Sequence, residues 1–188
     1  MLGYFVVKDE LKESACETIN LLREYGVSET VMLTGDRAEN AEEIASLAGV
    51  DRVESELLPE DKLSRLEQIM KEKEDLGKVV YVGDGINDAP VLARADIGIA
   101  MGAMGSDAAI EAADVVLMDD DSMKIADAVR MSKSTKRIVL QNIIFALSVK
   151  IGFMLLGAFG VANMWLAIFA DVGVSVIAIL NAMRTLKL

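Results

Sequence analysis

Apolar and polar residues alternate along the first two thirds of this chain with two periods. Short apolar runs of strand length are separated by segments whose apolar residues recur at helical spacing. The runs predict strands at residues 4–7, 30–33, 52–55, from Val79 onward, 97–100 and 115–118. The intervening segments predict helices at 9–25, 38–48, 60–74, near Val91 and near 107–112. Repeated strand–helix units of this kind predict an α/β fold, a parallel sheet with helices on both faces.

The pattern changes after Arg137. From Ile138 to Met183 the ionisable side chains are Lys150 and Asp171, and the stretch far exceeds the ~20 apolar residues that one membrane span needs. Gly160–Asn163 divides it into segments 138–159 and 164–183, which predict a transmembrane helical hairpin. A buried helical pair in a soluble core is the alternative, but soluble helices normally carry a polar face.

The charged residues that flank the apolar stretch predict its orientation. Basic residues occur on both sides of it, at Lys133, Lys136, Arg137, Arg184 and Lys187. We therefore expect both termini and the α/β domain to be cytoplasmic in a multi-pass protein of the cell membrane. The predicted parts are the α/β domain at 1–121, a connecting helix at 122–137 and the hairpin with a short tail at 138–188. Asp119–Asp121 is interpreted as a solvated turn that caps the connecting helix.

Composition narrows the function. The formal net charge is −11, which makes nucleic acid an unsuitable partner. The chain has no histidine, which excludes histidine metal sites and histidine bases. Its one cysteine, Cys16, forms no disulfide within the chain, and we expect a small buried thiol there.

Residues 79–90 carry the main candidate chemistry. A β-branched and aromatic run leads into a turn that contains Asp84 and Asp88. Gly83 and Gly85 allow a sharp turn and close approach of the backbone to a bound group. Both carboxylates then lie at the carboxyl end of a strand, where open α/β sheets bind ligands. They predict a Mg²⁺ site, since Mg²⁺ favours one or two carboxylates plus phosphate; the alternative is a plain Gly-Asp turn.

Two further elements are predicted to converge on this turn. Thr34, Gly35 and Asp36 end a predicted strand, where a hydroxyl and backbone amides can hold phosphate oxygens. Lys62, in the first turn of a predicted helix, can neutralise a phosphate as a point charge. Each of these alone has a simpler interpretation, as a strand-end turn or a solvated lysine. Together they predict electrostatic stabilisation of phosphoryl transfer.

Lys150 and Asp171 are the candidate residues within the membrane. At ~1.5 Å per residue both lie ~12–15 Å from the tip of the hairpin, near the centre of a ~30 Å hydrocarbon core. Ionisable residues at that depth mark an ion path or a buried pair. An ion pair that only locks the hairpin is the alternative. The segment suggests cation transport without identifying the cation, because a carboxylate alone selects poorly among divalent ions.

The combined motifs resemble the C-terminal part of the heavy-metal-transporting P-type ATPases. The matching segments are Met32-Leu33-Thr34-Gly35-Asp36, Leu58-Pro59-Glu60-Asp61-Lys62, residues 82–90, residues 95–102 and residues 113–117. The resemblance covers essentially the whole chain. It implies that residues 1–121 are a partial phosphorylation domain with an incomplete haloacid-dehalogenase-like fold. It implies that Asp84 binds Mg²⁺ and that Asn87 and Asp88 order the phosphorylation site. It further implies that Thr34 contacts the phosphoryl group and that Lys62 neutralises it.

The hairpin resembles the zinc-, cadmium- and lead-exporting branch of that family. Its signature is a lysine in the first span and Asp-x-Gly in the second, here Lys150 and Asp171-Val172-Gly173. The resemblance implies that Asp171 is a ligand of the transported Zn²⁺, Cd²⁺ or Pb²⁺ and that Lys150 is its counter-charge. It also implies ATP as a cofactor. The implied partners are the lipid bilayer and the missing N-terminal part of the same pump.

Several family motifs do not occur in these 188 residues. The phosphorylated Asp-Lys-Thr-Gly-Thr and the thiolate-bearing Cys-Pro-Cys sequences are absent. Without an acceptor aspartate there is no aspartyl-phosphate, so we expect this chain alone neither to hydrolyse ATP nor to pump. The alternatives are a membrane-tethered phosphatase of the same fold and a non-catalytic membrane module.

Overall fold

The computed structural model describes residues 11–73, 76–83, 88–102, 107–160 and 164–187. It consists of two compact units, Met1–Ala126 and Asp127–Leu188. The first carries the strands and most of the polar contacts, and the second consists of long apolar helices.

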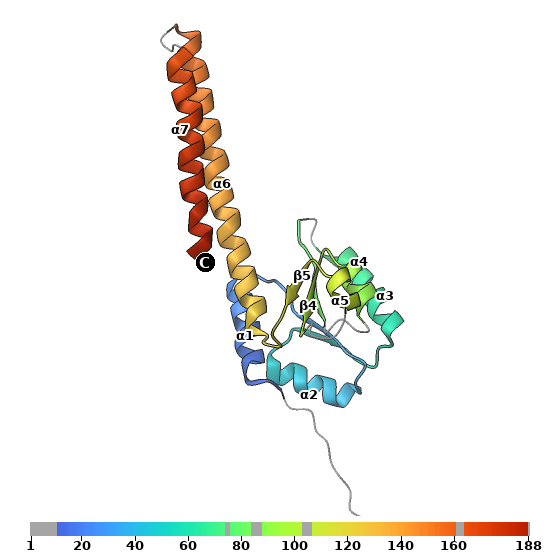
Figure 1. The fold of residues 1–188 in the computed structure, drawn as a ribbon. Helices are drawn as coiled ribbons and strands as arrows, with labels where there is room; N and C mark the ends of the chain where they lie inside the picture. Colours follow the sequence, from blue (N-terminus) through green and yellow to red (C-terminus); the bar gives the residue numbers. More distant parts are fainter. Residues whose placement is uncertain (1–10, 74–75, 84–87, 103–106, 161–163, 188) are drawn as a thin grey trace, which may run out of the picture. The chain divides into compact units, whose positions relative to one another are not determined.

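Within the described residues, the first unit alternates strands and helices in the predicted order (Figure 1). The strand predicted at 4–7 lies outside the described residues. Its elements are α1 (Glu13–Glu24), β1 (Val31–Leu33), α2 (Ala38–Ala48), β2 (Arg52–Glu54), α3 (Pro59–Glu72), β3 (Val80–Gly83), α4 (Ala89–Arg94), β4 (Ile97–Met101), α5 (Asp107–Ala112) and β5 (Val115–Leu117). Helix α2 has the bounds that its pattern predicts, because Gly49 adopts a left-handed φ of 79° and ends it. Proline starts α3, since its missing N–H is not needed in the first turn.

All the described strand pairs are parallel, as the repeated units predict. Strands β1 and β2 form one ladder, with Met32 opposite Val53. Strands β3, β4 and β5 form a second in that order, with Val82 opposite Ile99 and Ala100 opposite Val116. Helices α3, α4 and α5 gather beside this second sheet (Figure 1). The carboxyl ends of β1 and β3 therefore carry the two predicted phosphate-handling turns.

The hydrophobic core lies between the three-stranded sheet and helices α3 and α4. Its buried members are Leu66, Tyr81, Val91, Leu92 and Ala100. Leu33 of β1 packs against the same cluster, so the core also anchors the first ladder. Helix α4 approaches β4 so closely that a Cβ on Gly98 would lie 2.6 Å from the Leu92 carbonyl oxygen.

Aspartates tie the amino ends of neighbouring strands together. In three places, the residue just before a strand is an aspartate. Its carboxylate accepts a backbone N–H near the start of the adjacent strand. The pairs are Thr30 N with Asp51 Oδ2 at 2.8 Å, Val79 N with Asp96 Oδ2 at 2.9 Å and Gly98 N with Asp114 Oδ2 at 2.9 Å. These bonds satisfy N–H groups at the sheet's end that would otherwise need water.

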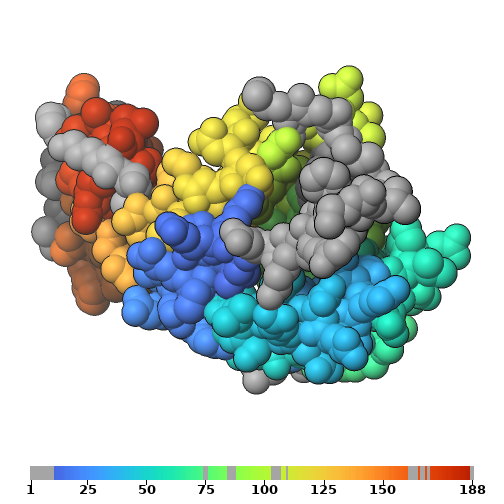
Figure 2. Space-filling model, turned by 90° about the horizontal axis from the view of Figure 1, so that it is seen from below, coloured from blue at the N-terminus to red at the C-terminus, as the bar shows by residue number. Residues whose placement is uncertain are grey.

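Helix α1 departs from its prediction. It begins at Glu13, because Lys12 is extended, with φ −62° and ψ 137°, and its ammonium contacts Asp120 at 2.5 Å. Cys16 is exposed, so the expectation of a buried thiol is wrong. The buried residue of this helix is Thr18, whose hydroxyl donates to the Ser14 carbonyl at 2.8 Å. On the face shown in Figure 2, α1 lies beside α2, where Arg23 Nη2 donates to the Gly49 carbonyl at 2.6 Å.

The second unit contains most of α6 (Met123–Ala158), then α7 (Met164–Ala182) and a 3₁₀ helix, η1 (Met183–Lys187). Asp121 Oδ1 accepts the Met123 N–H at 3.0 Å, which confirms its predicted capping position. Among the described residues, α6 is long and apolar enough to cross a membrane. Only 6% of its most apolar stretch is buried inside the structure. Helices α6 and α7 run side by side in opposite directions (Figure 1). Residues 161–163 lie outside the described residues, so the structure gives the two helices of the predicted hairpin and not its tip.

Candidate functional site

Lys62 and Asp88 form the centre of the candidate site. Lys62 is the fourth residue of α3, and Asp88 is the N-cap of α4. Lys62 Nζ donates to Asp88 Oδ1 at 3.0 Å, and the two side chains are 20% and 10% exposed. A charge pair that is this far removed from water interacts more strongly than one on the surface. The structure thus joins two of the residues that the sequence predicts to act together.

The backbone of Asp88 fixes the position of its carboxylate. Its carbonyl accepts the N–H groups of Val91 and Leu92 at 2.9 and 2.8 Å, and both of these residues are buried in the core. A Cβ on Gly83 would lie 2.9 Å from Asp88 Oδ2. Glycine at the end of β3 therefore leaves the room that the Asp88 side chain occupies.

Thr34, Gly35 and Asp36 form a separate turn after β1. Thr34 Oγ1 donates to Asp36 Oδ2 at 2.8 Å and accepts the Asp36 N–H at 3.1 Å. A Cβ on Gly35 would lie 3.2 Å from the Leu57 carbonyl oxygen, so the turn is packed closely against the segment that precedes α3. Within the described residues, no hydrogen bond or ion pair joins this turn to Lys62 or Asp88.

Backbone hydrogen bonds nevertheless connect the two parts of the site. Thr34 donates to the Glu54 carbonyl and accepts the Leu57 N–H, both at 3.0 Å. At the next residue, the Leu58 N–H donates to Asp61 Oδ2 at 3.0 Å where α3, which carries Lys62, begins. The segment that leads into α3 and Lys62 is thus hydrogen-bonded to the Thr34 turn.

Asp84, Gly85 and Asn87 lie outside the described residues. Their predicted contributions, the Mg²⁺ ligand and the ordering amide, stay predictions. The described oxygen donors among the predicted site residues include the buried carboxylate of Asp88 and the hydroxyl of Thr34. Such hard oxygen donors fit Mg²⁺ and would not suit a metal that prefers thiolates. No cluster of three or more metal-ligating side chains is found among the described residues.

Lys150 and Asp171 are both exposed residues of the second unit, on α6 and α7 respectively. In the described parts of these helices no ion pair joins them. The Asp171 backbone carbonyl accepts the Ser175 hydroxyl at 3.0 Å, a bond within α7. Their predicted roles as cation ligand and counter-charge stay predictions.

The shifted pKa values belong to structural carboxylates away from this site. Hydrogen bonds from Thr30 and Arg23 lower the pKa of Asp51 to about 2. Hydrogen bonds from Lys73 and Val79 hold the pKa of Asp96 far below its usual value. Both carboxylates lie at the amino ends of strands, opposite the edge that carries Asp88.

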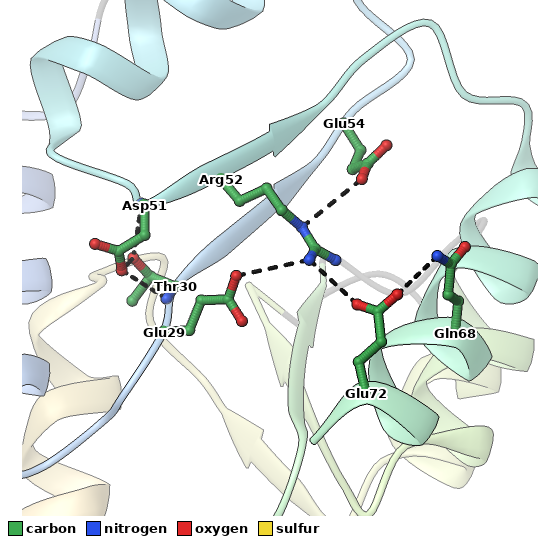
Figure 3. A network of polar contacts seen from close by, with 7 residues as sticks. All are labelled: Glu29, Thr30, Asp51, Arg52, Glu54, Gln68 and Glu72. Carbon is green, nitrogen blue, oxygen red and sulfur yellow. Dashed lines mark hydrogen bonds and ion pairs between the residues drawn. The ribbon is translucent and has the colours of Figure 1, made fainter. Parts of the chain in front are cut away.

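A further polar network surrounds Arg52 (Figure 3). Its Nη1 lies 3.3 Å from Glu72 Oε2 and 3.7 Å from Glu29 Oε1, and its Nε lies 3.7 Å from Glu54 Oε1. Gln68 donates to Glu72 at 2.7 Å, and this bond, with that from Arg52, lowers the pKa of Glu72. The network ties β2 to α3 and is structural.

Sequence reasoning missed two features. Glu56 has a left-handed φ of 57° beside the Thr34 turn, where its N–H donates to the Asp36 carbonyl at 2.9 Å. A glutamate gives no sequence signal for that conformation. The other is an amide contact between Asn142 and Asn181, with Oδ1 and Nδ2 2.8 Å apart. Its only signal is the presence of amides in apolar helices.

The chain is similar in sequence and in fold to known proteins, and these similarities agree with the geometry described above. The haloacid dehalogenase-like hydrolase family matches residues 1–96. The chain belongs to this family. The predicted haloacid-dehalogenase-like fold is thereby confirmed.

Within this haloacid dehalogenase-like family, the chain is related over nearly its whole length to metal-transporting P-type ATPases. It is 52% identical over 186 residues to the cadmium, zinc and cobalt-transporting ATPase of Bacillus subtilis (strain 168), covering 99% of this chain and 26% of that protein. It is also 52% identical over 185 residues to the zinc-transporting ATPase of Synechocystis sp. (strain ATCC 27184 / PCC 6803 / Kazusa), covering 98% of this chain and 26% of that protein. The resemblance predicted from the motifs is confirmed, and the chain spans about a quarter of the length of these relatives.

A solved structure agrees over both units of the haloacid dehalogenase-like chain. The crystal structure of a zinc-transporting PIB-type ATPase in the E2.Pi state superposes with a TM-score of 0.86 at 36% identity. The match covers 95% of this chain and 28% of that one. The long apolar helices, like the α/β unit, thus have counterparts in that structure.

Proposed function

We propose that this chain is the phosphoryl-handling and cation-conducting part of a P-type ATPase that exports Zn²⁺, Cd²⁺ or Pb²⁺. The observation that carries the proposal is the 52% identity, over 186 residues, to a cadmium, zinc and cobalt-transporting ATPase. The Lys62–Asp88 pair and the apolar helix α6 are the structural features that support it. The aspartyl-phosphate and the bound ATP would reside on parts of the pump beyond these 188 residues.

In this proposal the α/β unit stabilises a phosphoryl group as it is transferred. The group carries negative charge, and Lys62 supplies a positive charge in a place with little water. Asp88 holds that ammonium in position, and Asn87 orders the same turn. Thr34, Gly35 and Asp36 offer a hydroxyl and backbone amides to the phosphoryl oxygens. When bound, Mg²⁺ would be held by Asp84 with Asp88 and would neutralise further phosphate charge.

The second unit would pass the cation. Asp171 is the one carboxylate between Ile138 and Met183, and Lys150 is the one cation. We assign Asp171 as a ligand of the transported ion and Lys150 as its counter-charge. The flanking basic residues support a multi-pass arrangement with both ends cytoplasmic.

A chimera tests the proposal directly. This chain would replace the matching quarter of the Bacillus subtilis ATPase, in a strain that lacks that pump. We expect the chimera to restore growth in Zn²⁺ or Cd²⁺ and to hydrolyse ATP when the metal is added. A chimera that is made and inserted normally but gives no resistance would contradict the proposal.

Two substitutions in that chimera test the assigned residues. Asp84→Ala should stop turnover of the phosphoenzyme, with exposed Asp107→Ala as the matched control. Asp171→Ala should remove metal-stimulated hydrolysis, with Asp127→Ala, an aspartate 50% exposed on α6, as its control. Unchanged zinc stimulation in the Asp171 variant would defeat the assignment of the transport site.

Cys16 offers a test of orientation. It is the one cysteine of the chain and is exposed on α1. With the 188-residue chain in membrane vesicles, a maleimide that cannot cross the bilayer should label Cys16 only when the vesicles are inside-out. Labelling in right-side-out vesicles would overturn the cytoplasmic placement of the α/β unit.

The membrane-tethered phosphatase is the competing function. It would require a nucleophile among these residues, and the α/β unit alone would release phosphate from p-nitrophenyl phosphate. We expect no release above background from the purified chain, because an acceptor aspartate in the family's sequence context is absent.

A further inference from the structure

A cluster of amide side chains joins α6 to α7 near the ends that carry the basic residues. Asn181 Nδ2 donates to Asn142 Oδ1 at 2.8 Å and lies 3.4 Å from Gln141 Oε1. Asn142 Nδ2 in turn donates to the Ala178 backbone carbonyl at 3.1 Å. Arg184 Nη1 donates to Asn181 Oδ1 at 3.1 Å. We call Asn142 and Asn181, with these bonds, the amide lock.

The amide lock stands out because its surroundings are apolar. Around it, α6 and α7 expose large aliphatic side chains, among them Val139, Ile143, Ile177 and Leu180. Such faces pack in several registers with similar energy, since lipid tails are as apolar as the side chains. A polar side chain at one position in an apolar helix pair can select a single register, because any other register leaves its amide unpaired.

Cation binding is a poor alternative for the same cluster. The acceptor oxygen of Asn181 already receives the Arg184 guanidinium, whose positive charge would repel a metal ion. The oxygen of Asn142 receives the Asn181 amide. The cluster is therefore built to hold two helices together.

The register that the amide lock selects has a consequence for Lys150 and Asp171. Lys150 follows Asn142 by eight residues, and Asp171 precedes Asn181 by ten. At 1.5 Å per residue, these separations place both charges about 12–15 Å from the lock along antiparallel helices. A slip by one helical turn would change the depth of one charge relative to the other by ~5.4 Å.

The same counting gives their direction. At 100° per residue, Lys150 is rotated about 80° from the Asn142 face in one sense, and Asp171 about 80° from the Asn181 face in the other. On two antiparallel helices placed side by side, these rotations point both side chains to the same side of the hairpin. This agrees with the exposure of both side chains.

We infer that Asn142 and Asn181 are positioning residues that hold Asp171 and Lys150 at one depth and on one side of the hairpin. The inference rests on the proposed function in so far as Asp171 is a ligand of the transported cation. The lock itself touches neither charge and acts through the register of α6 on α7.

The first test measures the register. The 188-residue chain, with Cys16→Ser, carries spin labels at Ile151 and Val172, both exposed and each adjacent to one of the charges. In phospholipid vesicles, the label-to-label distance should be narrowly distributed. Asn142→Leu with Asn181→Leu should broaden it or shift it by about one helical turn, ~5.4 Å.

Control variants separate the loss of the amide lock from a general effect of leucine substitution on the helix pair. Ser148→Leu makes the same kind of change on α6 at an exposed residue and should leave the distance unchanged. Leucine raises the apolar character of a span, so membrane insertion is not at risk. Asn142→Leu alone, which keeps the Asn181–Arg184 bond, should have a smaller effect than the double change. An unaltered distance distribution in the double variant would overturn the inference.

The second test measures zinc in the chimeric pump. The double variant should raise the Zn²⁺ concentration for half-maximal ATP hydrolysis by ~10-fold, as changes behind a metal ligand commonly do, while Ser148→Leu should not. A shifted register with unaltered zinc dependence would overturn the positioning role. If Asp171→Ala leaves zinc dependence unaltered, the proposed function fails instead, and the label distances still decide whether the lock sets the register.

Discussion

The two units use apolar residues in opposite ways. In the first unit Leu66, Val91 and Leu92 are at most 2% exposed and pack between a sheet and helices. In α6, only 6% of the apolar window is buried, and leucines such as Leu147 and Leu155 are more than half exposed. The first arrangement is stable because water is expelled from the core. The second suits a lipid solvent, in which exposed leucine costs nothing. Equal substitutions in the two units should therefore have unequal effects.

A leucine truncation should show the largest difference. Leu66→Ala opens a cavity in the core and should lower the free energy of unfolding of the first unit by about 2–5 kcal/mol. Leu155→Ala, at a residue 53% exposed on α6, should leave that free energy unchanged. Hydrogen exchange of the β3 and α3 amides, in the chain held in vesicles, measures both. Equal losses would break the contrast between the units.

The Lys62–Asp88 pair should show the next effect. Lys62→Met leaves the Asp88 carboxylate, which is 10% exposed, without its partner, and should cost about 3 kcal/mol. The double change Lys62→Met with Asp88→Asn removes both charges and should recover most of that loss. The same exchange measurement applies at α3 and α4. A single variant as stable as the parent would show that the pair contributes nothing to the first unit.

Glycine substitutions should differ in sign between the units. Gly98→Ala places a Cβ 2.6 Å from the Leu92 carbonyl oxygen and should destabilise the first unit by about 1–3 kcal/mol. Gly152→Ala, on α6, meets nothing within 4 Å and should stabilise its helix by about 0.5–1 kcal/mol. Exchange rates at β4 and at α6 report the two effects. Destabilisation by both would mean that α6 is packed as closely as the core.

The smallest effect should be the pH dependence contributed by Asp51. Its pKa falls from 3.8 to about 2 on folding. Its stabilisation is therefore fully present above pH 3.8 and is lost as the pH falls toward 2. Asp51→Asn should flatten the stability profile in that window, measured by acid unfolding at β1 and β2. A profile that keeps its slope would assign the acid sensitivity to other carboxylates.

How far the sequence predicts the structure depends on the range of the interaction. The bounds of α2 and α5 agree with their patterns, because a left-handed glycine and local spacing decide them. The start of α1 does not, because Lys12 contacts Asp120, 108 residues away, and stays extended. The expectation of a buried Cys16 is wrong because helical spacing does not say which face of α1 its neighbours cover.

The candidate site shows the same division. The motifs identify Lys62 and Asp88 as residues that act together, and the structure places them 3.0 Å apart. The motifs do not show that the Thr34 hydroxyl donates a hydrogen bond to Asp36, or that Glu56 adopts a left-handed conformation beside that turn. Those details follow from how the turn packs against the segment before α3.

By itself, the sequence determined the alternation of parallel strands and helices, the long apolar helices and the identity of the residues that carry charge, because periodicity and composition are local properties. Only the tertiary structure decided that the Lys62 ammonium meets Asp88, that aspartates tie neighbouring strands and that Asn142 meets Asn181 across two helices. Those contacts join residues distant in sequence, and their geometry is set by packing, which no local pattern encodes.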